Sequence, residues 1–560
     1  MTAVDIAIRG GTIIDGTGSP RFRGDVGIAG GRIAEIGHVG DAVLDVDATD
    51  RIVAPGFVDV HTHYDAQVMW DPTLSPSPGH GVTTAVIGNC GFGIAPTRPA
   101  HRSLIIGTLE RVEGMDANAL TAGLDDWGFE SFPEYLDAIQ RAQPLINVAA
   151  LVGHTPIRLY VMGADAMERA ATEDEMAAMQ SLVREAMVAG AIGIATSSAP
   201  NHVGYLGKPV PSLFATHEEF LRLADPLGEL ERGVMQITIG AGFNFSGMSE
   251  IAQRTGRPVC WAALVTAEDG SQRHRRNLDI SHQMRDAGIP VYPQVSCRPV
   301  QFEVSFAQPY IFESMSLFRD VSSADHEGRR LIYADPTFRE RFARAIREGH
   351  DGVFKPSWER AVVSVHAADP SLEERTVADI ARERGDDPSN VALDLSLQTD
   401  LQTRFRFALL NVNETEVGHL LRDPIGVLGL SDAGAHASQL CDAGFSTHLL
   451  GHWVRELEVL TLEEAVRMLT SRPAEVYGLT DRGLLAPGRP ADVVIFDPVS
   501  VQAGPLRRVA DLPGGGERLV SDGMGIDAIF VNGKMIDASG ASASRHGELL
   551  RGGHGGTGPR

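Results

Sequence analysis

Residues 57–65 read FVDVHTHYD, an apolar run that stops abruptly at two histidines one residue apart. In a β-strand, side chains at positions i and i+2 point to the same side, so His61 and His63 can present two imidazole rings to one ion while Thr62 faces away. An HxH pair alone is weak evidence for a metal site, because histidines at a strand end also serve as ordinary hydrogen-bonding groups. The two interpretations are about equal until further ligands are found.

Short apolar runs alternate with helical stretches through the middle of the chain, a pattern that predicts βα units and a parallel sheet. The eight runs cover residues 52–63, 83–90, 147–154, 191–197, 234–239, 258–265, 289–296 and 426–434. Eight parallel strands favour an α/β fold of the TIM (β/α)8 barrel type, in which the active site lies at the C-terminal strand ends. The alternative is an open doubly wound sheet, but no GxGxxG glycine pattern follows the first run. We therefore predict the barrel.

The two ends of the chain both contain short alternating segments separated by glycine-rich turns, which predicts small antiparallel strands. We expect one small β-sandwich domain built from both termini, with residues 1–53 as its N-terminal part and residues 476–545 as its C-terminal part. The barrel would occupy residues 54–475, with a long insertion at about residues 298–425 that folds over its mouth. Residues 546–560 are Gly-rich and are predicted to form a flexible tail.

Composition narrows the classes of function. The chain has 560 residues, with 49 Lys and Arg against 73 Asp and Glu, for a formal net charge of −24. The acidic residues are spread along the chain, which disfavours nucleic acid and membrane as partners and favours a small-molecule substrate. Four cysteines without CxxC spacing and an N-terminus unlike a signal peptide predict a cytoplasmic protein. No apolar stretch is long enough to predict a membrane span, and a homo-oligomer is left open.

Two further polar residues close other apolar runs. Cys90 ends the second run in IGNCGFG, and Asp432 ends the eighth in GLSDAGAH. A buried cysteine is by default a small apolar residue, and an Asp after a Ser can cap a helix. At one end of a barrel, however, His61, His63, Cys90 and Asp432 would supply two nitrogens, a thiolate and a carboxylate. Such a set suits tetrahedral Zn²⁺.

Several segments together resemble the amidohydrolase superfamily and, within it, the N-acyl-D-amino-acid deacylases (D-aminoacylases). They are PGFVDVHTHYD, VTTAVIGNCGFGIAP, NVAALVGHTPIR, GKPVPS, LGLSDAGAH and GLLAPGRPADVVIFDP, and the resemblance covers nearly the whole chain. The HxH pair and the strand-eight Asp occur across the superfamily, whereas the Cys in GNCG and the GKPVPS segment point to the deacylase branch. The resemblance implies a TIM barrel with a terminal β-sandwich, and hydrolysis of an amide bond by metal-activated water.

The sequence departs from this branch at two strands. D-aminoacylases hold their tightly bound zinc with the strand-two Cys and one His each from strands five and six. Here the fifth run ends in QITIG, which includes Thr238, and the sixth reads WAALV, where the branch has a histidine and its substrate-binding Lys. The fourth run ends in ATSSAP, which offers no lysine to bridge two metals. We therefore expect one ion, most simply Zn²⁺, with another divalent metal left open.

Three functions remain open at this point. The first is a one-metal amidohydrolase acting on an N-acyl (D-)amino acid or a related small amide, in which Asp432 takes the proton of the attacking water and passes it to the leaving amine. The second is a cyclic-amide hydrolase or a decarboxylase on the same scaffold. The third is a non-catalytic binding or assembly relative that has lost metal ligands, which the fold alone does not exclude. Polar groups kept at four strand-end positions argue against the third.

Five other residues are candidates for substrate binding. His154 ends the third run and could donate to the substrate carbonyl, or be a hydrogen-bonded barrel histidine. Arg298 follows the seventh run and could pair with a substrate carboxylate in place of the missing lysine, although surface solvation is the default for an arginine. His202 and Tyr205 lie in the loop after the fourth run, and His202 could also replace a lost ligand. His436 follows the eighth run and could bond the metal-site carboxylate or face solvent.

Overall fold

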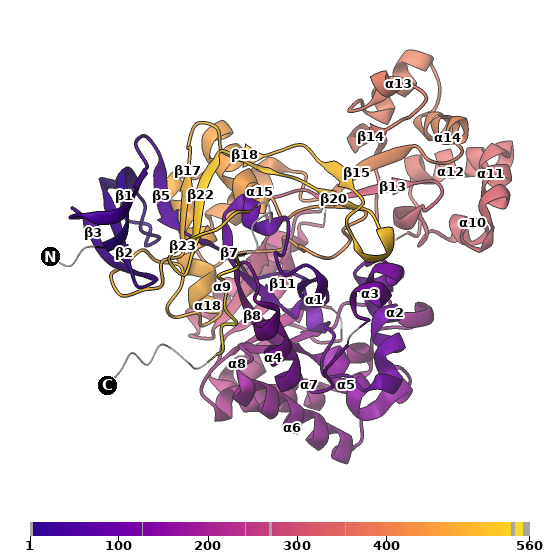
Figure 1. The fold of residues 1–560 in the computed structure, drawn as a ribbon. Coiled ribbons are helices and arrows are strands. Elements are labelled where there is room, and N and C mark those ends of the chain that lie inside the picture. The colour runs from indigo at the N-terminus through magenta and orange to yellow at the C-terminus, as the bar shows by residue number, and fades with distance from the viewer. Residues whose placement is uncertain are drawn as a thin grey trace.

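The computed structural model describes residues 4–125, 127–240, 242–267, 271–352, 354–538 and 544–552, and its central feature is a curled sheet of parallel strands (Figure 1). In chain order the eight strands are β6 (Phe57–Asp59), β7 (Val82–Ile87), β8 (Asn147–Gly153), β9 (Gly193–Ser197), β10 (Val234–Thr238), β11 (Val259–Leu264), β12 (Val291–Val295) and β16 (Val427–Leu428). The sheet closes where Thr62 forms a parallel bridge with Ala433. The predicted TIM barrel is confirmed.

Helices follow the strands and pack around the sheet. They include α4 (Phe132–Ala142), α6 (Glu173–Ala189), α7 (His217–Glu229), α8 (Phe245–Thr255), α9 (Arg273–Asp286) and α15 (Glu414–Arg422). Because helices cover the outer face and side chains fill the inside, every residue of β7 and β8 is buried. This double burial explains why the barrel strands read as continuous apolar runs instead of alternating ones.

Both chain termini contribute to one mixed sheet, as expected. Its strands are β1 (Val4–Ile13), β2 (Phe22–Ala29), β3 (Arg32–Gly37), β4 (Ala42–Asp47), β5 (Ile52–Pro55), β17 (Val493–Phe496), β22 (Ile526–Val531) and β23 (Lys534–Met535). The two ends of the chain join where β5 pairs with β17. The first apolar run, expected to be one strand, is therefore two: β5 belongs to this sheet and β6 to the barrel. They meet at Gly56, where a Cβ atom would lie 2.1 Å from Thr83 Oγ1.

The insertion is a lobe with its own core, at the upper right of Figure 1. Its antiparallel strands are β13 (Val300–Ser305), β14 (Ala361–Val365) and β15 (Arg404–Leu410), and its helices are α10 (Arg319–Ser323), α11 (His326–Ala334), α12 (Pro336–Glu348), α13 (Val377–Arg384) and α14 (Pro388–Gln398). Val417 and Leu420 of α15 pack in the barrel core instead. The lobe therefore ends earlier than the predicted residue 425, and α15 is a barrel helix.

A segment of the C-terminal part leaves the terminal sheet and crosses to the barrel mouth, which the sequence did not predict. It contains β18 (Gln502–Ala503), β19 (Arg507–Val509), β20 (Arg518–Val520) and β21 (Gly523–Met524), drawn in yellow in Figure 1. The Leu519 N–H donates to the Ala437 carbonyl at 2.7 Å, and the Arg508 guanidinium bonds Glu303 at the base of the lobe. We call residues 502–524 the mouth-crossing segment.

The start of the predicted flexible tail is bonded to the barrel, which corrects that expectation for residues 546–552. The Val148 N–H donates to the Glu548 carbonyl at 2.9 Å, and the Leu550 N–H donates back to Val148 at 2.7 Å. Residues 553–560 lie outside the described part of the chain. A cavity of about 780 Å³ adjoins residues 548–552 at the N-terminal strand ends. It is therefore at the end of the barrel opposite to His61.

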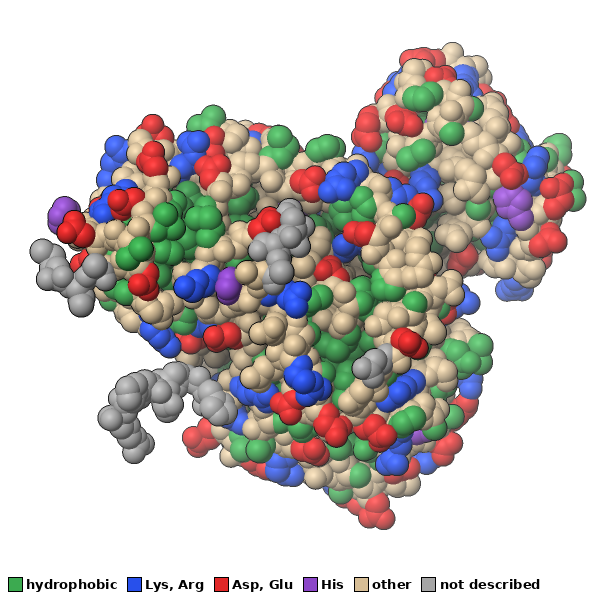
Figure 2. Space-filling model, viewed as in Figure 1, with side chains coloured by type: hydrophobic (Ala, Val, Ile, Leu, Met, Phe, Trp, Pro, Cys, Tyr) green, Lys and Arg blue, Asp and Glu red, His purple; other side chains and the backbone are tan. Residues whose placement is uncertain are grey.

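The surface carries mixed charge. On the face shown in Figure 2, basic and acidic side chains are interspersed, so the acidic excess is not gathered into one patch there. Among the described residues, no helix has both the length and the apolar character needed to cross a membrane. All four cysteines are buried and unpaired with one another.

Candidate metal centre

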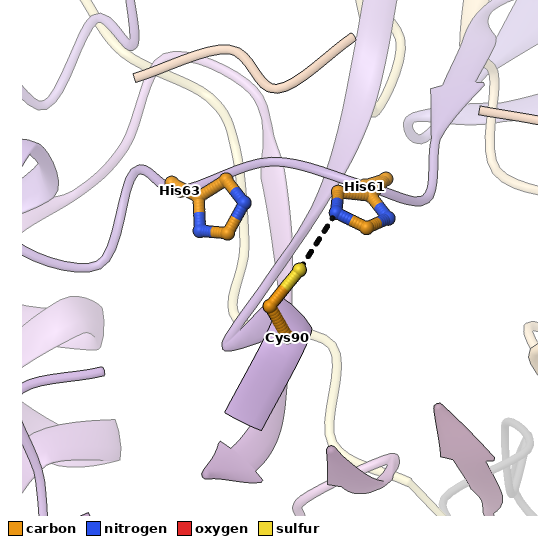
Figure 3. Close-up of side chains that lie close together, drawn as sticks. All are labelled: His61, His63 and Cys90. Atoms are coloured by element: carbon orange, nitrogen blue, oxygen red, sulfur yellow. Dashed lines mark hydrogen bonds between the residues drawn. The ribbon is translucent and has the colours of Figure 1, made fainter. Parts of the chain in front are cut away.

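Three side chains meet at the C-terminal ends of β6 and β7 (Figure 3). One potential ligand atom from each of His61, His63 and Cys90 lies within 4.8 Å of the other two, and all three residues are buried. Nε2 of His61 is 3.3 Å from Sγ of Cys90. In Figure 3 the two rings lie along one segment, and Cys90 reaches toward them from the turn that follows β7. The fold thus brings together residues that are 29 positions apart in sequence.

Asp432 faces the same two histidines from the loop after β16. Its Oδ1 lies 3.3 Å from Nε2 of His61 and 3.9 Å from Nε2 of His63. The Asp432 side chain is 39% exposed, whereas the two imidazoles are almost fully buried. The loop has positive φ angles at Leu430, Asp432 and His436 (61°, 45° and 47°), and backbone strain of this kind concentrates at functional sites. All four predicted metal ligands therefore converge, and Asp432 is the one open to solvent.

Hydrogen bonds from backbone and hydroxyl groups hold the HxH segment between its two neighbours in the barrel. The Thr62 hydroxyl donates to the Val86 carbonyl of β7 at 2.8 Å, so Thr62 faces away from the histidines as the strand pattern predicts. On the other side, the His63 N–H donates to the Ala433 carbonyl at 2.7 Å. The Ser431 hydroxyl donates to the His61 carbonyl at 3.0 Å. The direction of both rings is thus set by barrel pairing.

The His61 ring is oriented by an amide from the seventh strand. Its Nδ1 lies 2.6 Å from Oε1 of Gln294, and Nε2 of Gln294 donates to the Tyr477 hydroxyl at 2.6 Å. Because the amide nitrogen is used by Tyr477, the amide oxygen accepts the Nδ1–H of His61. The lone pair of Nε2 is then free for a metal. Gln294 was missed in the sequence, although a glutamine inside a buried apolar run was a usable signal.

Cys90 sits on a tight turn that points its sulfur into the site. Its φ is +56°, and its N–H donates to Oε1 of Gln236 at 2.7 Å. At Gly91, a Cβ atom would lie 2.6 Å from Thr196 Cα, so only glycine fits there. Burial, followed by the nearby charges of Glu113 and Asp432, raises the pKa of the Cys90 thiol well above its usual value. A bound cation would reverse this effect by stabilising the thiolate.

Burial also sets the charge of the neighbouring groups. It lowers the pKa of His63 well below its usual value, with His61 and His436 as further causes, so the ring is neutral as a metal ligand must be. Burial raises the pKa of Asp59 and of Asp65 to about 7. Asp65 Oδ2 accepts from the Gly88 N–H at 3.1 Å and so braces the turn that carries the cysteine.

Glu113 is a site residue that no sequence pattern indicates. It directly follows α2 (Arg102–Val112), and its buried Oε1 lies 3.6 Å from Nδ1 of His63. Burial, Asp432 and Asp65 raise the pKa of Glu113 well above its usual value. A charged residue just after a helix is ordinary in sequence, and only the fold shows that this one is buried beside a ligand histidine.

His154 lies in a different network. Its Nδ1 is 2.8 Å from Thr196 Oγ1 and its Nε2 is 2.8 Å from Glu219 Oε1 in α7. Glu219 also pairs with Arg158, and the His154 ring is fully buried. Both ring nitrogens are therefore occupied, which corrects the expectation that His154 donates to a substrate. The hydrogen-bonded barrel histidine is the interpretation that fits.

His202 and Tyr205 lie in the loop after β9. The His202 Nδ1 is 2.7 Å from the Ser197 hydroxyl. Burial, His436 and His61 lower the pKa of His202 to about 4. His202 is therefore near the site, but it is not one of the three residues that could hold the metal together. Tyr205 packs on Gly107 of α2, where an added Cβ would lie 2.1 Å from the tyrosine ring.

His436 and Arg298 both have internal contacts. The His436 ring centroid is 5.6 Å from that of Phe302 in β13, so the ring is held between the site and the lobe instead of facing solvent. Nε of Arg298 donates to Asp442 Oδ1 at 2.7 Å, and the arginine side chain is only 15% exposed. Surface solvation is therefore not its role. Because Asp442 already balances the charge of Arg298, a substrate carboxylate bound there would be the second anion beside this arginine.

A small apolar cavity of about 30 Å³ adjoins His63 at the barrel mouth. Trp70 of α1 (Gln67–Trp70) and Leu120 of α3 (Ala117–Gly123) line one side, and Leu512 of the mouth-crossing segment lines another. The terminal part of the chain therefore helps to wall the space next to a candidate ligand.

The donor set fits a metal of the zinc type. Two imidazole nitrogens, a thiolate sulfur and a carboxylate oxygen are borderline-soft ligands in the combination that zinc prefers. His61 has its outer ring nitrogen hydrogen-bonded by a separate acceptor, as histidine ligands usually do.

Comparison with known proteins shows the family of this chain. The model described as "Amidohydrolase family" matches residues 46–523. The N-acyl-D-glutamate deacylase of Alcaligenes xylosoxydans xylosoxydans is 31% identical, over 98% of this chain and 96% of that protein. An N-acyl-D-glutamate deacylase from Bordetella bronchiseptica, solved with zinc and a phosphonate inhibitor that mimics the tetrahedral intermediate, is 28% identical with a TM-score of 0.67, over 98% of this chain and 100% of that one. A D-aminoacylase, whose structure was solved to study the functional role of its binuclear metal centre, is 25% identical with a TM-score of 0.67. The match covers 98% of this chain and 100% of that one. The chain belongs to the amidohydrolase family.

Proposed function

We propose that the protein is a metal-dependent amidohydrolase that cleaves the amide bond of an N-acyl-D-amino acid or a related small amide. The observation that carries this proposal is the convergence of His61, His63, Cys90 and Asp432 at the C-terminal strand ends of the barrel. The substrate class is supported by the relatives, which match nearly the full chain and are deacylases of N-acyl-D-glutamate and D-aminoacylases.

One zinc ion is the proposed cofactor, held by Nε2 of His61, Nε2 of His63 and Sγ of Cys90, with Asp432 beside it. When bound, it would polarise the scissile carbonyl and activate the attacking water. A second ion would need ligands from strands five and six. β10 ends in Ile237 and Thr238, and β11 reads VCWAAL, so neither strand supplies an imidazole there.

Asp432 is the proposed proton carrier. A carboxylate can accept the proton of the attacking water and return it to the leaving amine only if both can reach it. The half-exposed Asp432 side chain meets this requirement, whereas Asp59, Asp65 and Glu113 are buried. After this transfer, the negative charge of Asp432 would also attract the protonated leaving amine.

Elemental analysis of the purified protein should give about one zinc-like ion per chain. Cys90→Ala should lose most of the metal, because two imidazoles and one carboxylate make a weaker zinc site than a set with thiolate. Cys297→Ala is the matched control, since Cys297 is also buried and its thiol donates to the Phe445 carbonyl at 3.3 Å. Two tightly bound ions per chain, or full metal content in Cys90→Ala, would contradict the one-metal proposal.

The metal-loaded protein should hydrolyse N-acyl-D-amino acids faster than their L-enantiomers. Asp432→Asn should lower kcat by roughly 10²- to 10⁴-fold, the usual contribution of a general acid–base residue, while far-UV circular dichroism stays unchanged. Asp423→Asn, which alters a carboxylate paired with His282 outside the site, is the control. The proposal fails if neither enantiomeric series is turned over, or if Asp432→Asn is as active as the parent protein.

Arg298→Met tests the remaining carboxylate-binding candidate. If Arg298 binds a substrate carboxylate, the ratio of kcat/KM for an N-acyl amino acid to that for its uncharged amide should fall. The fall corresponds to a loss of about 2 to 5 kcal/mol in binding free energy, the cost of removing one partner of a buried charge pair. The ratio is the informative quantity, because the substitution also leaves Asp442 buried without its cation and this affects both substrates equally. An unchanged ratio would leave Arg298 as an internal partner of Asp442.

A further inference from the structure

The two histidine rings of the site have similar surroundings. In each ring, Nε2 faces Oδ1 of Asp432, at 3.3 Å for His61 and 3.9 Å for His63. The outer nitrogen, Nδ1, faces an oxygen from another part of the chain. For His61 this is Oε1 of Gln294 at 2.6 Å, and for His63 it is Oε1 of Glu113 at 3.6 Å.

The position of Glu113 is fixed by its own backbone. Its carbonyl accepts the N–H of His436 at 2.5 Å. The next residue, Gly114, has a φ of +56°, and a Cβ atom there would lie 2.6 Å from Nδ1 of His436. The Glu113 side chain is 6% exposed, and its Oε1 lies 3.6 Å from Nδ1 of His63. Burying a carboxylate in this way costs stability, so a benefit from elsewhere is needed to explain it.

We propose that Glu113 is a positioning residue of the metal centre: its carboxylate accepts the Nδ1–H of His63 and so holds Nε2 of that ring toward the metal. The inference rests on the metal site of the proposed function but not on its substrate. At 3.6 Å the two atoms are just beyond hydrogen-bond range. A shift of a few tenths of an ångström in either side chain forms the bond.

The carboxylate gives His63 a property that the amide of Gln294 does not give His61. A carboxylate behind a ligand imidazole makes its inner nitrogen a stronger electron donor. Glu113 also lies in the same buried site as Cys90 and Asp432, where a bound divalent cation would favour its ionised form. The ionised carboxylate would then make His63 the stronger electron donor of the two imidazoles.

Zinc affinity, measured by competition with a coloured chelator, tests the inference without any substrate. Glu113→Met removes the acceptor at similar volume and should weaken zinc binding by about 10- to 100-fold. Glu113→Gln keeps an oxygen that accepts the Nδ1–H and should recover much of this loss. Unchanged affinity in Glu113→Met would overturn the inference. A Glu113→Gln variant that binds zinc as weakly as Glu113→Met would also overturn it. The glutamine amide can replace Glu113 as a hydrogen-bond acceptor for His63, but it cannot replace a carboxylate that binds the metal directly.

Stability of the metal-free protein separates positioning from a structural role. Glu113→Met should fold and unfold at the same temperature as the parent protein or a higher one, since a buried polar group is replaced by an apolar one of similar volume. The matched control is Glu303→Met, which alters an equally buried carboxylate paired with Arg508 and should lower the unfolding temperature while leaving zinc affinity unchanged. A Glu113→Met chain that fails to fold, or unfolds at a lower temperature, would contradict the inference.

The visible spectrum of the cobalt(II) form gives an independent readout. Loss of the His63 orientation should change the d–d absorption in Glu113→Met and much less in Glu113→Gln, because these bands report the geometry of the ligands. Identical spectra for all three proteins would count against the role of Glu113. If the protein hydrolyses none of the acyl amino acids, the zinc and cobalt results still stand, so the two proposals fail separately.

Discussion

The hydrogen bonds that close the barrel also place its metal ligands. The segment from His61 to His63 lies between β7 and the loop after β16, bonded to Val86 on one side and to Ala433 on the other. Each such bond contributes about 0.5 to 1.5 kcal/mol net. Because strand side chains alternate, this pairing register decides that both imidazoles face the mouth and that Thr62 does not. A slip of one residue would close the same barrel and destroy the site.

From this constraint the rest of the centre follows. The same closure brings Asp432 to the Nε2 atoms of both histidines. The neighbouring strand leads into the glycine-flanked turn that carries Cys90, and the seventh strand supplies the amide that orients His61. The four ligands therefore come from three strand ends, those of β6, β7 and β16, and the parallel barrel is the arrangement that makes these ends meet. The fold supplies proximity, and the buried acceptors behind the rings supply direction.

The sequence predicted the parts of the structure that repeat a simple pattern. Apolar runs ending in polar residues gave the barrel and the four candidate ligands, since burial on both faces leaves a clear record in composition. It could not assign residues whose role depends on distant contacts. For His154 the sequence left open a substrate donor or a hydrogen-bonded barrel histidine, and only the structure shows that Thr196 and Glu219 occupy both of its nitrogens. Glu113 looked like an ordinary charge after a helix, and its position beside His63 arises only from tertiary packing.

The barrel mouth is built by three parts of the chain that are separate in sequence. Leu120 comes from α3, between β7 and β8, Phe302 from the lobe and Leu512 from the mouth-crossing segment. The terminal sheet thus does more than cap the barrel, because its excursion reaches the space beside His63. A segment that leaves its sheet in this way has no periodic pattern in sequence. The alternation in residues 476–545 therefore predicted strands, but not that some of them lie at the barrel mouth.

The most direct test of the account is a crystal structure of the zinc-loaded protein with anomalous data at the zinc edge. We expect one strong peak, about 2.0 to 2.1 Å from Nε2 of His61 and of His63 and about 2.3 Å from Sγ of Cys90, the usual zinc bond lengths. A peak elsewhere in the barrel, or one in which the metal is bound without Cys90, would contradict the proposed centre.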